Sequence, residues 1–136
     1  MTTRTGPVGE GRELLVWRVL GALFLLAVGG IHLYLVLTST GGVLGMLFTL
    51  QALGAFVLAV AMLVLRGRLL AAATVLSLLF MVGSLLALVL ALTVGLFGLQ
   101  SSLSYDLAPT SLVVESIGTV VLLVATARVL RRDRVR

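Results

Sequence analysis

The stretch LAPTSLVVESIGTVVLLVATARVL, residues 107–130, is long and apolar enough to form a helix that crosses a lipid bilayer. It also holds Glu115, an ionisable side chain in the middle of an apolar run. A carboxyl group inside a membrane is energetically costly, and such groups typically face the bundle interior or a polar cavity. Residues 107–130 therefore predict a membrane-spanning helix and make Glu115 the first candidate for a functional group.

Three further stretches have the same character and lie at residues 14–37, 43–65 and 69–97. A spanning helix needs about 20 predominantly apolar residues, which each stretch supplies. The connections are short, so consecutive helices should be antiparallel neighbours. The sequence thus predicts an all-α, integral membrane, up-down four-helix bundle as one domain. Residues 1–13 are predicted to be a disordered cytoplasmic N-terminus and residues 131–136 a basic cytoplasmic tail.

The composition supports this class of protein and excludes several kinds of chemistry. Of the 136 residues, 60% are hydrophobic and 11% are charged, and a soluble domain of this size could not bury so much apolar surface. Cysteine is absent, which excludes disulfides and thiolate metal sites, and His32 is the single histidine. No catalytic triad, phosphate-binding glycine loop or metal-ligand spacing occurs. We therefore predict no metal site and no cofactor, with a quinone or a haem as the alternatives, and the sequence favours a protein that is not an enzyme.

The basic residues indicate how the chain is oriented in the membrane. All ten are arginines. They lie before or at the start of the first span, between the second and third, and at the end of the fourth: Arg4, Arg12, Arg18, Arg66, Arg68, Arg128, Arg131, Arg132, Arg134 and Arg136. The positive-inside rule then places both termini in the cytoplasm. The topology accounts for the net charge of +5, so the expected partner is the lipid bilayer rather than a nucleic acid. Arginine without lysine, together with abundant alanine and glycine, indicates GC-rich coding, which is typical of bacteria such as actinobacteria. The expected location is therefore the bacterial inner membrane.

Polar side chains within the spans lie at similar depths in the outer leaflet. His32 is about 8 Å inside the outer end of its span, and Gln51 and Glu115 are about 12 Å inside theirs, at the helical rise per residue. Ser111 and Thr93 lie at nearby depths, as do Thr49 and Ser116. If these helix faces converge, the side chains form a polar pocket beneath the outer loop at residues 98–106.

Three interpretations of this group remain open. His32, Gln51 and Glu115 could bond one another and only fix the helix register. They could instead form a site for a proton, a cation or a quinone-type head group, because a carboxyl group in low dielectric can carry a proton. His32 could also ligate a haem iron, although a bis-histidine site would need two chains.

Two segments carry a resemblance to a known family. RVLGALFLLAVGGIHLYL, residues 18–35, is similar to the opening helix of the DoxX-like four-helix membrane proteins. LFTLQALGAFVLAVAMLVLRGRLLAAATVLSLLFMVGS, residues 47–84, resembles the second and third helices of that family joined by a basic turn. The fourth helix, with SLVVESIGTVVLL, looks more like uncharacterised actinobacterial four-span membrane proteins. The resemblance implies a four-helix bundle that can be a partner subunit in quinone-linked or oxidative-stress membrane complexes.

The sequence leaves three functions to compare. The small size, the short loops and the lack of catalytic motifs favour a non-enzymatic accessory or scaffold subunit, with other membrane subunits or a second copy as partner. A second hypothesis is a quinone- or redox-linked DoxX-like subunit in which Glu115 and His32 handle protons. The third is a dimeric proton-coupled transporter of small molecules.

Overall fold

The computed structural model describes residues 7–38, 40–96, 98, 100–105 and 107–135. Its helices are α1 (Pro7–Thr38), α2 (Gly42–Val64), α3 (Gly67–Thr93) and α4 (Ala108–Arg134). Each is long and apolar enough to cross a membrane. The predicted all-α class and the four predicted spans are confirmed. Four such helices are consistent with a multi-pass membrane protein.

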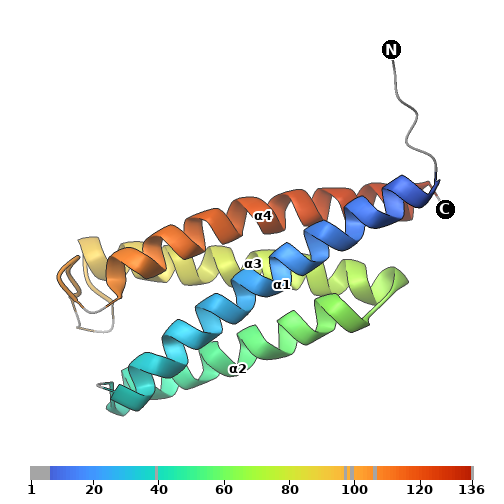
Figure 1. Ribbon diagram of the computed structural model, residues 1–136. Coiled ribbons are helices and arrows are strands. Elements are labelled where there is room, and N and C mark those ends of the chain that lie inside the picture. The colour runs from blue at the N-terminus through green and yellow to red at the C-terminus, as the bar shows by residue number, and fades with distance from the viewer. Residues whose placement is uncertain (1–6, 39, 97, 99, 106, 136) are drawn as a thin grey trace.

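Consecutive helices run in opposite directions, and the start of α1 and the end of α4 lie at the same end of the molecule (Figure 1). We call this the terminal end, and we call the opposite end, which carries the α1–α2 and α3–α4 connections, the loop end. α1 packs along α2 and also against α4, and α3 packs along α4, whereas α2 and α3 contact each other less. Toward the loop end the pair α1–α2 diverges from the pair α3–α4 (Figure 1). This divergence leaves space between the pairs that side chains only partly fill.

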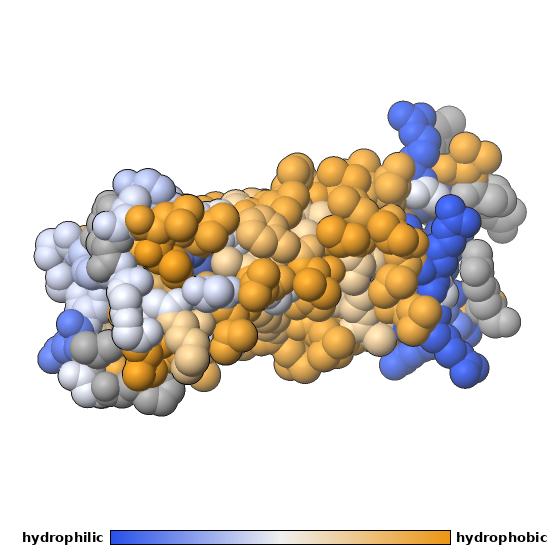
Figure 2. Space-filling model, turned by 90° about the horizontal axis from the view of Figure 1, so that it is seen from below, coloured by the Kyte–Doolittle hydropathy of each residue, from blue (hydrophilic) through white to orange (hydrophobic). Residues whose placement is uncertain are grey.

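An apolar band separates the two ends of the molecule. Figure 2 shows this band in orange on one face, between a strongly hydrophilic terminal end and a more mildly polar loop end. Large apolar side chains on every helix are exposed there, for example Leu23, Leu53, Leu79 and Val120. Such a surface is unfavourable in water but matches the hydrocarbon interior of a bilayer, where helices satisfy all their backbone groups internally.

Small residues allow the helices to approach closely. A Cβ atom added at Gly29 of α1 would lie 3.1 Å from the Cβ of Ala55 on α2. One added at Gly118 of α4 would lie 3.0 Å from Cε of Met81 on α3. Helix association in lipid depends on such close packing rather than on the hydrophobic effect. The main buried cluster comprises Ala22, Leu25, Val28, Ala59, Met62, Met81, Leu122 and Ala125.

Arg18 connects α1 to the end of α2. Its Nε donates a hydrogen bond of 2.8 Å to the carbonyl oxygen of Met62. Its Nη2 donates to the carbonyl oxygens of Leu63 and Leu65, at 3.0 and 2.9 Å. The last carbonyls of a helix have no partner within the helix, and a cation there also interacts favourably with the helix dipole. Arg18 therefore stabilises the turn between α2 and α3.

Helical structure extends into both predicted terminal segments. α1 already begins at Pro7, so the prediction of a disordered start is wrong for residues 7–13, and residues 1–6 lie outside the described residues. An ion pair between Glu13 and Arg128 of α4 holds this first part of α1 against the bundle. α4 continues to Arg134, into the predicted tail, where arginines suit the negative end of the helix dipole.

The third helix is shorter than the predicted span of residues 69–97. It ends at Thr93, because Gly95 adopts a left-handed φ of 87°. The amides of Val94 and Gly95 both donate to the carbonyl oxygen of Leu90, at 3.0 and 2.8 Å. Gly95 thus takes the left-handed position just after the helix, where glycine is commonly found.

Candidate functional site

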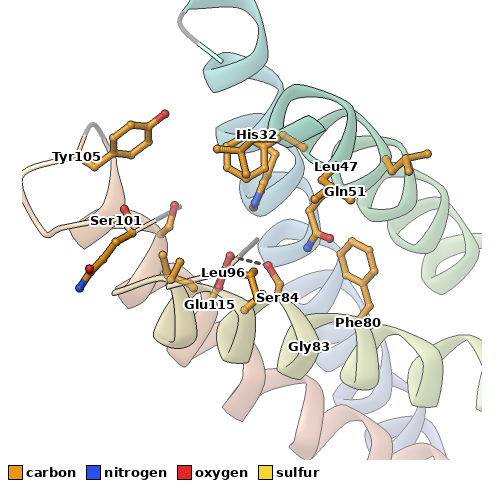
Figure 3. Close-up of a pocket in the computed structure, with 18 of the residues that line it drawn as sticks. His32, Leu47, Gln51, Phe80, Gly83, Ser84, Leu96, Ser101, Tyr105 and Glu115 are labelled. Carbon is orange, nitrogen blue, oxygen red and sulfur yellow. Dashed lines mark hydrogen bonds between the residues drawn. The ribbon is translucent and has the colours of Figure 1, made fainter. Parts of the chain in front are cut away.

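A cavity of about 650 Å³ lies between the diverging helix pairs near the loop end. Residues of all four helices line it, and Leu96, Gln100, Ser101 and Tyr105 of the α3–α4 connection cover one side (Figure 3). Most of the wall is apolar, with contributions from Leu44, Leu47, Phe48, Phe80, Ala87 and Leu88. The polar side chains in the helical part of the wall are His32, Gln51, Ser84, Ser111 and Glu115. A mostly apolar chamber with a few convergent polar groups is the common form of a small-molecule site.

Glu115 is buried in the wall that α4 contributes, with a relative exposure of 1%. Its Oε1 accepts a hydrogen bond of 2.8 Å from the Ser84 hydroxyl of α3. Its Oε2 is also buried, but it has no hydrogen-bond partner among the described residues. The carboxyl group is therefore held on one side and leaves one oxygen unsatisfied.

Gln51 of α2 approaches the same place from the opposite wall. Figure 3 shows Gln51, Ser84 and Glu115 pointing toward one another. The Nε2 of Gln51 is buried and, within the described part of the chain, donates to no acceptor. Buried polar atoms nearly always have a partner, because an unpaired one costs about 1–3 kcal/mol. Gln51 and Glu115 thus supply an unpaired donor and an unpaired oxygen beside one cavity.

His32 of α1 has one ring nitrogen engaged by its own helix. Nδ1 lies 2.8 Å from the carbonyl oxygen of Val28, and since a carbonyl can only accept, Nδ1 carries the proton. In the neutral ring this leaves Nε2 as an acceptor. The ring also packs edge-on against Phe48, with centroids 5.0 Å apart and planes at 84°. This contact and the hydrogen bond together orient the imidazole at the cavity wall.

The structure brings together four of the five candidate residues. Ser111 lies one helical turn before Glu115 and lines the cavity. Thr93 does not, and its inclusion is a correction: it is exposed and its hydroxyl donates to the Val89 carbonyl of its own helix at 2.7 Å. Because α3 ends at Thr93 rather than at residue 97, Thr93 lies at the helix end instead of about 6 Å inside it.

Two further residues near this depth also bond their own helices. Thr49 donates to Gly45 and Ser116 to Leu112, and neither lines the cavity.

His32, Gln51 and Glu115 share a cavity but not hydrogen bonds. No hydrogen bond joins any two of them in the residues that the structure describes. The interpretation that they bond one another and only fix helix register therefore finds no support in these contacts. Gln51 Nε2 and Glu115 Oε2 stay without a protein partner beside the cavity in the described residues.

Sequence reasoning missed two contributions to this site. Ser84 belongs to a stripe of residues at helical spacing on the third span, but with that span extended to residue 97 it lies too deep to match Glu115. With the true end at Thr93, Ser84 lies nine residues inside, close to the depth of Glu115. The sequence predicts a pocket beneath the loop at residues 98–106 but not which loop residues line it; these are Gln100, Ser101 and Tyr105.

Neither a metal site nor a comparison with known proteins assigns a function to this cavity. Among the described residues, no group of three or more His, Asp or Glu side chains could hold a metal ion. No family model matches the chain, and comparisons with curated proteins and with solved structures also find no match. The DoxX-like resemblance therefore stays a prediction.

Proposed function

We propose that the chain is a small integral membrane protein that binds an amphiphilic molecule with a quinone-type head group in the loop-end cavity. The observation that carries this proposal is the pair of unpaired buried atoms, Gln51 Nε2 and Glu115 Oε2, beside one largely apolar chamber. An apolar molecule alone would leave both atoms unsatisfied. A head group with polar atoms would satisfy them while its apolar part contacts the leucine and phenylalanine wall.

The chemistry of the wall suits both redox forms of such a head group. A quinone carbonyl only accepts hydrogen bonds, and Gln51 Nε2 is a free donor. A quinol hydroxyl can donate, and Nε2 of His32 and Oε2 of Glu115 are potential acceptors. A haem is less well supported, because only one histidine is present and its ring is fixed against Phe48.

The proposed setting follows from the positions of the arginines. The positive-inside rule favours a terminal end that faces the cytoplasm. In a bacterial inner membrane the cavity would then lie in the outer half of the bilayer. We infer that the protein acts there as a non-enzymatic accessory subunit of a membrane complex, similar in role to the DoxX-like proteins. A dimeric proton-coupled transporter remains the competing hypothesis, and no contact in the cavity favours it.

Equilibrium binding of decyl-benzoquinone to the full chain in lipid nanodiscs tests the proposal. Gln51→Leu keeps the size of the side chain and removes the donor, so affinity should fall about tenfold, the effect of about 1.4 kcal/mol. Thr93→Val is the matched control outside the cavity and should leave affinity unchanged. Equal affinity in the Gln51→Leu variant would overturn the assignment of the head group. A visible absorption spectrum of the same preparation tests for haem independently.

A further inference from the structure

A second cavity, of about 350 Å³, lies at the terminal end where α1, the α2–α3 turn and α4 meet. Its charged lining consists of Arg18, Arg66, Arg132 and Asp133, each from one of these three elements. It shares no lining residue with the loop-end cavity. The function proposed above leaves this basic cavity unused.

Positive charge is in excess in this cavity. Arg66 and Arg132 are close enough to Arg18 to act on its guanidinium electrostatically. Asp133 is the one acidic residue of the lining, and it forms no ion pair with these arginines among the described residues. The ion pair found at this end joins Glu13 to Arg128 instead. Like charges gathered around a cavity repel each other unless an anion lies between them.

The geometry also presents donors to the cavity. Arg18 is held in place by its hydrogen bonds to the end of α2, which use Nε and Nη2 and leave Nη1 without a partner in the described chain. Gly67, the first residue of α3, lines the cavity, and the residue before it, Arg66, makes no side-chain cap. The first backbone amides of a helix have no partner within the helix and favour a negative charge.

We propose that this basic cavity binds a phosphate group, with Arg18, Arg66 and Arg132 as its ligands. Arginine presents paired donors that match phosphate oxygens. The cavity is lined by apolar residues such as Leu14 and Leu70 as well as by the arginines, so it lies where apolar and charged side chains meet, which is the level of lipid phosphates in a bilayer. Figure 2 shows such a boundary between the apolar band and the hydrophilic terminal end. The same chemistry would accept the head group of an anionic phospholipid or free inorganic phosphate.

The test compares two variants of the full chain with the same net charge. Arg66→Gln with Arg132→Gln removes two cavity arginines and keeps Arg18, which the fold needs. Arg12→Gln with Arg134→Gln removes two exposed arginines from the same end that do not line the cavity. Binding of phosphatidylglycerol, measured against phosphatidylcholine in detergent micelles, should weaken about tenfold or more in the first variant and by less than twofold in the second.

Inorganic phosphate, added without lipid, identifies the source of the ligand. If phosphate and phosphatidylglycerol both raise the unfolding temperature of the native chain, and neither does so in the variant with Arg66→Gln and Arg132→Gln, the result supports a site for any phosphate group. A response to the lipid alone, again lost in that variant, supports a lipid site. Equal weakening in the two variants, or no preference for phosphatidylglycerol in the native chain, overturns the proposal. Decyl-benzoquinone binding should be unchanged in both variants, so failure of one site does not imply failure of the other.

Discussion

The hydroxyl of Ser84 donates a hydrogen bond of 2.8 Å to Oε1 of Glu115, and this bond joins α3 to α4 at the wall of the loop-end cavity. It fixes one carboxylate oxygen while the other, Oε2, stays unpaired beside the cavity. The bond thus holds one oxygen of a buried carboxyl group in place. The same bond therefore contributes both to the packing of α3 against α4 and to the position of Glu115 at the cavity.

Ser84→Ala should destabilise the protein modestly. Hydrogen bonds between membrane helices contribute on average about 0.6 kcal/mol and at most about 1.7 kcal/mol, so we expect a loss of about 1 kcal/mol. Thermal unfolding in detergent measures this change. Ser116→Ala is the control, since Ser116 is exposed and bonds only its own helix. Unfolding at the same temperature in both variants would show that the Ser84–Glu115 bond contributes nothing.

Gly29→Ala should weaken the contact between α1 and α2. The added Cβ would lie 3.1 Å from the Cβ of Ala55 and 3.4 Å from the carbonyl oxygen of Ala52, so only movement of the helices can relieve the overlap. Overpacking of this kind typically costs about 1–3 kcal/mol. Gly30→Ala adds the same atom with nothing within 4 Å, and should be neutral or stabilising by up to about 1 kcal/mol. If the two neighbouring variants unfold alike in detergent, the close approach at Gly29 is not as described.

Gln51→Leu should stabilise the ligand-free protein while it weakens quinone binding. The buried Nε2 has no partner among the described residues, so its removal relieves a penalty of about 1–3 kcal/mol. Opposite changes in stability and affinity are typical of residues kept for function. The unfolding temperature of the delipidated, ligand-free variant should rise. A fall in that temperature would mean that Gln51 contributes to packing rather than to a binding site.

Arg18→Gln should destabilise the α2–α3 turn. The substitution removes charge-assisted hydrogen bonds to three carbonyl groups at the end of α2, for an expected loss of about 2 kcal/mol. Arg12→Gln removes the same charge from an exposed position of α1 and should change stability by less than about 0.5 kcal/mol. Hydrogen exchange of the turn amides distinguishes local opening from global unfolding. Unchanged protection in the Arg18→Gln variant would contradict this role.

Much of the fold follows from the sequence because lipid restricts the choices. A chain segment inside a bilayer must satisfy its own backbone groups, so four apolar stretches give four helices. The helix ends were harder to place, since apolar residues continue beyond Thr93 and only the left-handed Gly95 stops the helix. The segment at residues 7–13 is helical, and an exposed ion pair of Glu13 with Arg128 joins it to α4.

The sequence predicts how deep each candidate side chain lies in the membrane. It does not predict how the helices are rotated about their axes or which side chains contact one another. Depth matching selects His32, Gln51, Ser111 and Glu115, which line one cavity, but also Thr93, Thr49 and Ser116, which do not. Depth depends on the assumed helix end, which is why Thr93 was wrongly included and Ser84 missed. No periodic pattern reveals that the two helix pairs diverge, or that Gln51 and Glu115 line one cavity without a hydrogen bond between them in the described residues.

The most direct test of the central claim is decyl-benzoquinone binding when the cavity is narrowed from its own wall. Gly83 lines the cavity with nothing within 4 Å of an added Cβ, and Gly30 has equal space but lies outside it. Gly83→Leu and Gly30→Leu are therefore matched substitutions, and unfolding temperatures check that both variants fold. Our account predicts one saturable site per chain in the native protein, the same affinity in Gly30→Leu, and an affinity lower by about tenfold or more in Gly83→Leu. Equal affinity in Gly83→Leu and Gly30→Leu, or no saturable binding to the native chain, would contradict it.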